Sequence, residues 1–161
     1  VEQLTEKKVL RGRKLRADTT VVEANIHYPT DAQLLADGVR VVTRTVQRLQ
    51  KVGLAGTTAF RNVGRSIKRR LQRLGKGLKQ PEGQKQATRA TVTAEVLKIT
   101  KGVVRRAQAL RQRVVQENQK RPAPLREKVE RGLTRLDTWL ERTQRVIEQT
   151  RAGAGRRRAH S

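Results

Sequence analysis

The sequence contains no cysteine, so disulfide bonds and thiolate metal sites are excluded. Aromatic residues are almost absent, with one Trp, one Tyr and one Phe among 161 residues. No run of about 18 apolar residues occurs, which excludes a membrane-spanning helix of ordinary length. The N-terminal residues VEQLTEKK lack the apolar core of a secretory signal. We therefore predict a soluble chain with no membrane partner, and a cytoplasmic location is the default.

Acidic residues are also scarce, with 14 Asp and Glu against 38 Lys and Arg, which gives a formal net charge of +24. Such a charge opposes compaction and favours a polyanionic partner. Arginine outnumbers lysine 26 to 12, which suits bidentate contacts with phosphate. The lack of aromatic rings argues against base stacking and hence against a reader of single strands or RNA. The composition thus favours double-stranded DNA, bound through its backbone with little sequence choice.

Apolar residues at alternating spacings of three and four predict four amphipathic helices, at about 32–52, 60–78, 84–119 and 125–150. Thr30 or Asp31 is expected to cap the first helix. The apolar residues of each helix form a narrow stripe, which we call its seam. We therefore expect long antiparallel helices in hairpins or a loose bundle, and self-association through the seams is a further option. Residues 152–161 are small, basic and aperiodic, and are predicted to form a disordered tail.

Arginines on the helical faces away from these seams are the candidate DNA contacts. Charged faces of long helices are usually only solvated, but the imbalance here is too large for an ordinary mixed surface. The candidates are Arg40, Arg44, Arg48, Arg69, Arg70, Arg105 and Arg106. Trp139 lies beside the fourth seam and is more simply explained as a packing residue.

Residues 14–24, KLRADTTVVEA, form the one convincing strand pattern, with Asp18 at its centre. A carboxylate is unfavourable in a strand on propensity grounds. From the residues alone, an exposed polar position is the commoner explanation for such an acid. Asp31 and Asp37 lie near a helix start, where negative charge is favourable in any case.

The run GRKLRADTTVVEANIHYPTD, followed by LLADGVRVVTR at 34–44, resembles the first catalytic segment of DDE-type insertion-sequence transposases of the ISNCY or IS-four-like group. The resemblance implies that residues 1–30 hold the first strand region of a ribonuclease-H-like catalytic domain. It also implies that Asp18 is the first catalytic acid and a ligand of Mg²⁺. The family's activity is metal-dependent DNA strand cleavage and transfer.

The chain departs from that pattern because the second Asp and the Glu that such a site needs find no later strand. The remaining acids lie in predicted helices, among them Glu95, Glu117, Glu130, Asp137 and Glu148. We therefore expect a mainly α chain, with one or two residual strands at 1–30, a basic helical insertion at 31–151 and a tail at 152–161. It would be a piece of a transposase, inactive by itself. The alternative is a basic helical or coiled-coil DNA-binding protein with no enzyme ancestry.

Overall fold

The computed structural model describes residues 30–52 and 60–159, with side chains to residue 154. These residues form four helices, α2 (Asp31–Lys51), α3 (Gly64–Gly77), α4 (Glu82–Asn118) and α5 (Ala123–Ala159), and no strand. The prediction of a mainly α chain is confirmed. The predicted strand at 14–24, with Asp18, lies outside the described residues. In the described part of the chain, no helix has the length and apolar character to cross a membrane.

Local sequence signals explain where α2 begins. Thr30 is its N-cap, and its hydroxyl accepts a hydrogen bond from the Gln33 backbone N–H at 3.4 Å. The Gln33 side chain accepts in turn from the Thr30 backbone N–H at 2.8 Å, which completes a capping box. Thr30 rather than Asp31 is therefore the cap. The helix buries every residue of its predicted seam, namely Leu35, Val39, Val42, Val46 and Leu49.

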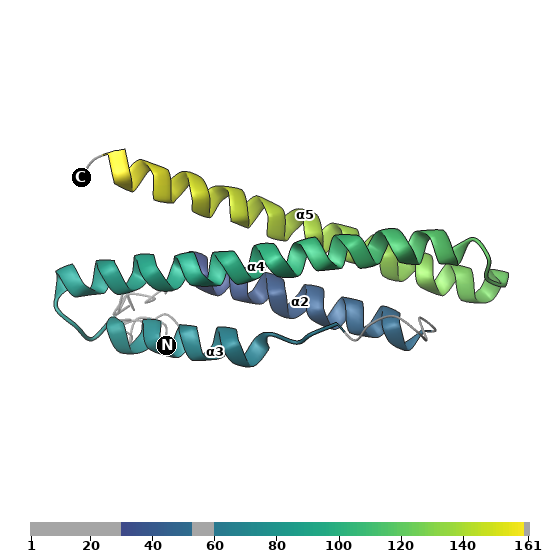
Figure 1. Ribbon diagram of the computed structural model, residues 1–161, viewed down its shortest axis with the longest axis horizontal. Helices are drawn as coiled ribbons and strands as arrows, with labels where there is room; N and C mark the ends of the chain where they lie inside the picture. The colour runs from purple at the N-terminus through teal and green to yellow at the C-terminus, as the bar shows by residue number, and fades with distance from the viewer. Residues whose placement is uncertain (1–29, 53–59, 160–161) are drawn as a thin grey trace, which may run out of the picture.

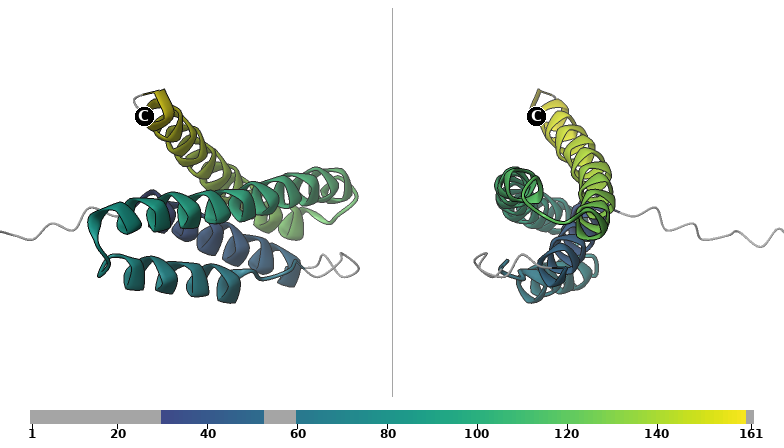
Figure 2. Two further views of the ribbon diagram at one scale, coloured as in Figure 1. Left: turned by 60° about the vertical axis from the view of Figure 1, so that its left-hand side comes forward. Right: turned by 90° about the vertical axis from the view of Figure 1, so that its right-hand side faces the viewer.

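The helices are arranged so that α2 and α4 form a central pair. Both contact α3 and α5, whereas α3 and α5 do not contact each other. Consecutive helices run antiparallel, and α5 diverges from α4 toward its C-terminal end (Figures 1 and 2). The bundle therefore has four sides, and the α3/α4 side faces away from the α2/α5 side.

The core is aliphatic and is filled by the predicted seams of all four helices. Val96, Val103, Val129 and Leu136 are among its fully buried members. The seams thus find their partners within one chain. Trp139 is half-buried against this core, as predicted for a packing residue.

Two glycines allow α2 and α5 to approach closely. A Cβ on Gly38 would lie 2.8 Å from the Thr143 hydroxyl, and a Cβ on Gly132 would clash with Leu49. Burial of Thr143 and Leu49 leaves little space for either to move. The close approach of α2 and α5 therefore requires a residue without a side chain at positions 38 and 132.

Helix ends differ from the prediction by more than two residues at two places. Residues 60–63 are not helical, and the Asn62 side chain accepts a hydrogen bond from the Gly64 N–H at 2.8 Å, which starts α3 later than expected. Residues 152–159 are helical where the sequence predicts a disordered tail. Ala and Arg have high helix propensity, so the helix continues through Gly153 and Gly155 although each glycine costs about 1 kcal/mol relative to Ala.

Candidate nucleic-acid interface

Helix α3 carries the most one-sided charge of the described elements. Its 14 residues include six basic residues and no acidic residue. Ile67, Leu74 and Gly77 are buried, and Gly77 fits against Thr88 of α4, where a Cβ would lie 2.5 Å from the Thr88 methyl group. This register turns most of the basic side chains outward, namely Arg65, Lys68, Arg69, Arg73 and Lys76.

Glu95 of α4 joins the two helices through a pair of arginines. Its Oε2 lies 2.7 Å from Arg70 Nε and 2.6 Å from Arg73 Nη2. The Arg73 hydrogen bond is the main cause that lowers the pKa of Glu95 below its ordinary value of 4.5. Arg70 is held further by the Ser66 carbonyl oxygen at 3.0 Å. The one acidic residue between α3 and α4 is therefore ionised and already neutralised.

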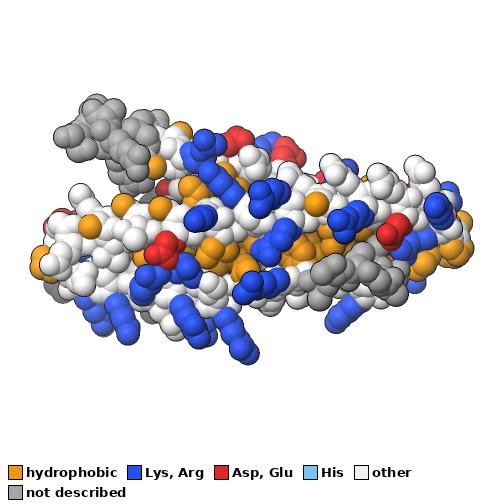
Figure 3. Space-filling model, in the orientation of Figure 1, with side chains coloured by type: hydrophobic (Ala, Val, Ile, Leu, Met, Phe, Trp, Pro, Cys, Tyr) orange, Lys and Arg blue, Asp and Glu red, His pale blue; other side chains and the backbone are white. Residues whose placement is uncertain are grey.

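Beside this cluster, basic side chains from α3, α4 and the segment before α3 share one side of the bundle. Arg61, Lys98 and Arg106 line an open groove there of about 500 Å³. Figure 3 shows Lys and Arg side chains along the lower edge of the molecule, where α3 lies, and across α4. We call this surface the α3/α4 basic face, and its members are Arg61, Arg69, Arg73, Lys98, Arg105 and Arg106.

Both aromatic rings in the described part of the chain lie beneath arginines. The Arg106 guanidinium is 5.8 Å from the centre of the Phe60 ring, and that of Arg142 is 5.0 Å from the Trp139 ring. Such contacts are favourable cation–π interactions. Neither ring is presented as a free platform for a nucleic-acid base, so phosphate is the better match for these surfaces.

The predicted DNA contacts do not share one surface. Arg69, Arg105 and Arg106 belong to the α3/α4 basic face, whereas Arg40, Arg44 and Arg48 are exposed on α2. Arg40 also pairs with Asp37 at 2.8 Å. Arg70 is occupied by Glu95 and Ser66, which makes it a link between helices.

Sequence reasoning missed Arg61, Arg73 and Lys98 of the α3/α4 basic face. It also missed three exposed basic residues of α5, namely Lys128, Arg131 and Arg135. A simple signal could have found the α3 part of this surface. Residues 38–81 contain twelve basic residues and no acidic residue. The α5 residues gave no such signal because acidic residues are interspersed with them along the helix.

The described residues hold no cluster of three His, Cys, Asp or Glu side chains able to bind a metal ion. Of the later acids, Glu95 and Asp137 are engaged by arginines, the latter by both Nε and Nη2 of Arg111. Asp18, the predicted ligand of Mg²⁺, lies outside the described part of the chain.

Comparison with protein-family models, curated proteins and solved structures finds no match to this chain.

Proposed function

We propose that the helical part of this chain binds the phosphate backbone of double-stranded DNA through the α3/α4 basic face. The observation that carries the proposal is the charge of this face. Five of its six cations have no ion pair in the described residues, and its one acid, Glu95, is held by Arg70 and the sixth cation, Arg73. Cations without local partners gain most from phosphate, since each neutralised phosphate releases condensed counterions.

The form of the surface favours a duplex over a single strand. Arg69 and Arg73 lie one turn apart on α3, and Lys98 and Arg105 lie two turns apart on α4. The cations therefore follow two rigid, antiparallel rods, which suits a regular row of phosphates. Contacts of this kind position a protein on DNA and read no sequence. Binding should consequently depend weakly on the duplex sequence.

The first prediction concerns a triple variant of the face, Arg61→Gln, Arg69→Gln and Lys98→Gln. No ion pair to a carboxylate holds any of the three within the described residues. Their replacement should weaken binding of a short labelled duplex, measured by fluorescence anisotropy, with little effect on stability because the residues are exposed.

The matched control removes the same amount of charge elsewhere, in the variant Arg40→Gln, Lys85→Gln and Arg145→Gln. Each of these side chains pairs with an acid three or four residues away. Such exposed pairs contribute little to stability. The control variant should bind nearly as well as the wild type. Equal weakening in both variants would mean that net charge alone drives binding, and the face would have no special role.

A link to DNA strand transfer remains a separate proposal, and it rests on Asp18 and the residues around it. The described acids are held in helices, so we expect no transposase activity from this chain alone. Purified protein with Mg²⁺ should leave a supercoiled plasmid intact. Specific nicking that disappears in Asp18→Ala would contradict this expectation and would show a working metal site.

A further inference from the structure

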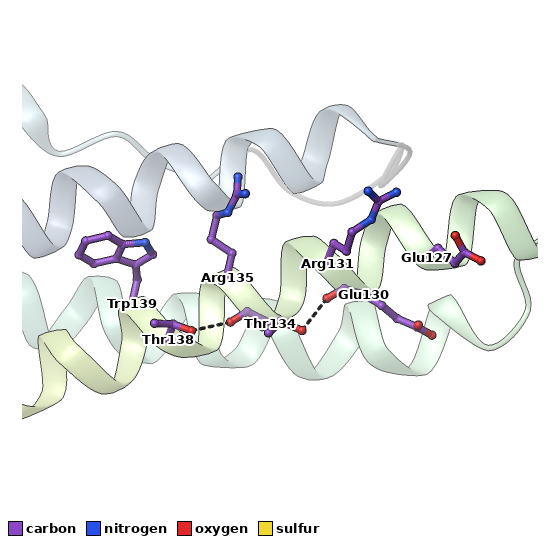
Figure 4. Close-up of a pocket in the computed structure, with 7 residues that line it drawn as sticks. All are labelled: Glu127, Glu130, Arg131, Thr134, Arg135, Thr138 and Trp139. Atoms are coloured by element: carbon purple, nitrogen blue, oxygen red, sulfur yellow. Dashed lines mark hydrogen bonds between the residues drawn. The ribbon is translucent and has the colours of Figure 1, made fainter.

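Helix α5 separates its charges onto two edges. Glu130, Asp137, Glu141 and Glu148 recur on one edge, and Asp137 binds Arg111 of α4. At Asp137 this edge therefore lies beside α4. The basic residues Lys128, Arg131 and Arg135 recur on the other edge, beside α2. Figure 4 shows Arg131 and Arg135 directed toward α2, with Glu130 on the opposite side of α5.

A second basic surface results where α5 meets α2. Arg48 of α2 joins Lys128, Arg131 and Arg135 around an open groove of about 370 Å³. Arg44 and Lys51 lie beside Arg48 on the exposed face of α2. In the part of the chain that the structure describes, no carboxylate forms an ion pair with any of these six. We call this surface the α2/α5 basic groove.

The two basic surfaces lie on opposite sides of the bundle. The α3/α4 side and the α2/α5 side face away from each other, because α3 and α5 do not touch. Two helical layers separate the surfaces, which corresponds to about 20 Å. A duplex has a persistence length of about 50 nm, so it cannot bend around so narrow a body to reach both surfaces.

We propose that this chain binds two DNA duplexes at once, one on the α3/α4 basic face and one in the α2/α5 basic groove, and so bridges them. The inference rests on the proposed function and adds a second site to it. Repulsion between the duplexes is not prohibitive, because the Debye length is about 10 Å at 0.1 M salt and the bundle between them is wider. Bridging should be independent of duplex sequence, as phosphate contacts are.

The test uses one duplex fixed to beads and a second, fluorescent duplex of unrelated sequence. The full-length chain should recruit the fluorescent duplex to the beads. Recruitment should rise and then fall as protein is added, since excess protein saturates each duplex separately. In the groove variant Arg48→Gln, Lys128→Gln and Arg131→Gln, recruitment should drop to the level of beads without protein, while a single duplex still binds by anisotropy.

The control variant Arg40→Gln, Lys85→Gln and Arg145→Gln should bridge as the wild type does. Recruitment that survives in the groove variant would overturn the inference, since paired copies of the chain would then explain it. Complete loss of single-duplex binding in the groove variant would also overturn it, because one site would then do all the binding. A wild-type chain that binds a duplex without bridging would refute the second site and leave the proposed function standing. Absence of duplex binding would refute both.

Discussion

At the scale of single residues, Glu95 has the most consequential position. A carboxylate in the middle of a basic face would ordinarily repel phosphate. Its ion pairs with Arg70 and Arg73 cancel that charge and fasten α3 to α4 at the same time. The acid therefore helps to hold the cations around it in one surface.

Low pH should weaken the ion pairs by which Glu95 links α3 to α4. Because the pKa of Glu95 is lowered in the folded chain, the link stabilises the fold above the ordinary carboxyl pKa and is lost as pH falls through the lowered value. We expect the melting temperature to fall less between neutral and acidic pH in Glu95→Gln than in the wild type. Glu148→Gln is the control, since that carboxylate accepts a hydrogen bond from the Gln144 amide and forms no ion pair with an arginine of the described residues. An identical pH response in wild type and Glu95→Gln would exclude the link as a source of stability.

At the scale of the elements, the sequence predicts the helices well and their ends less well. Seam residues such as Val42, Val103 and Leu136 are buried as the spacing of three and four requires. The end of α5 was missed because aperiodic Ala, Gly and Arg residues give no apolar signal, although the backbone remains helical to Ala159.

The candidate site was harder to predict than the helices. Periodicity fixes which face of a helix is buried, but it does not tell which other helix will lie beside each exposed edge. Arg44 and Arg69 look alike in the sequence, yet they lie on different sides of the bundle because α2 and α4 meet at its centre. The role of Arg70 depends on Glu95, 25 residues away in the sequence, and no local pattern indicates that pairing.

Replacement of two helical glycines by alanine should change the stability of the fold in opposite directions. Gly102→Ala places a methyl group in open space within α4, and should stabilise the fold by about 1 kcal/mol through helix propensity. Gly38→Ala gains the same propensity, but its methyl group collides with buried Thr143, and overpacking costs about 1–3 kcal/mol. In denaturant melts, the free energy of unfolding of Gly102→Ala should be higher than that of the wild type, and that of Gly38→Ala should be lower. A Gly38→Ala chain as stable as Gly102→Ala would contradict the close packing of α2 on α5.

At the scale of the whole molecule, two groups of basic side chains lie on opposite sides of the bundle. Residues 31–161 contain 32 basic and 10 acidic residues. Several of those acids are engaged within the bundle, as Glu95 is between α3 and α4 and Asp137 is between α4 and α5. Five cations without an ion pair in the described residues lie on the α3/α4 basic face and six lie in the α2/α5 basic groove, on the opposite side. Part of the high net charge is thereby presented on two surfaces, each suited to phosphate.

The central claim is that the α3/α4 basic face binds duplex phosphate, and the salt dependence of binding tests it most directly. The logarithm of the association constant should fall linearly with the logarithm of salt concentration, between about 50 and 200 mM. The comparison is made in the groove variant Arg48→Gln, Lys128→Gln and Arg131→Gln, so that the second surface does not contribute. Adding Arg61→Gln, Arg69→Gln and Lys98→Gln to it should make the slope smaller by about 3, or about one for each cation replaced. Adding Arg40→Gln, Lys85→Gln and Arg145→Gln instead should leave the slope unchanged. An affinity that does not change with salt, or an unchanged slope when the face cations are replaced, would contradict the claim.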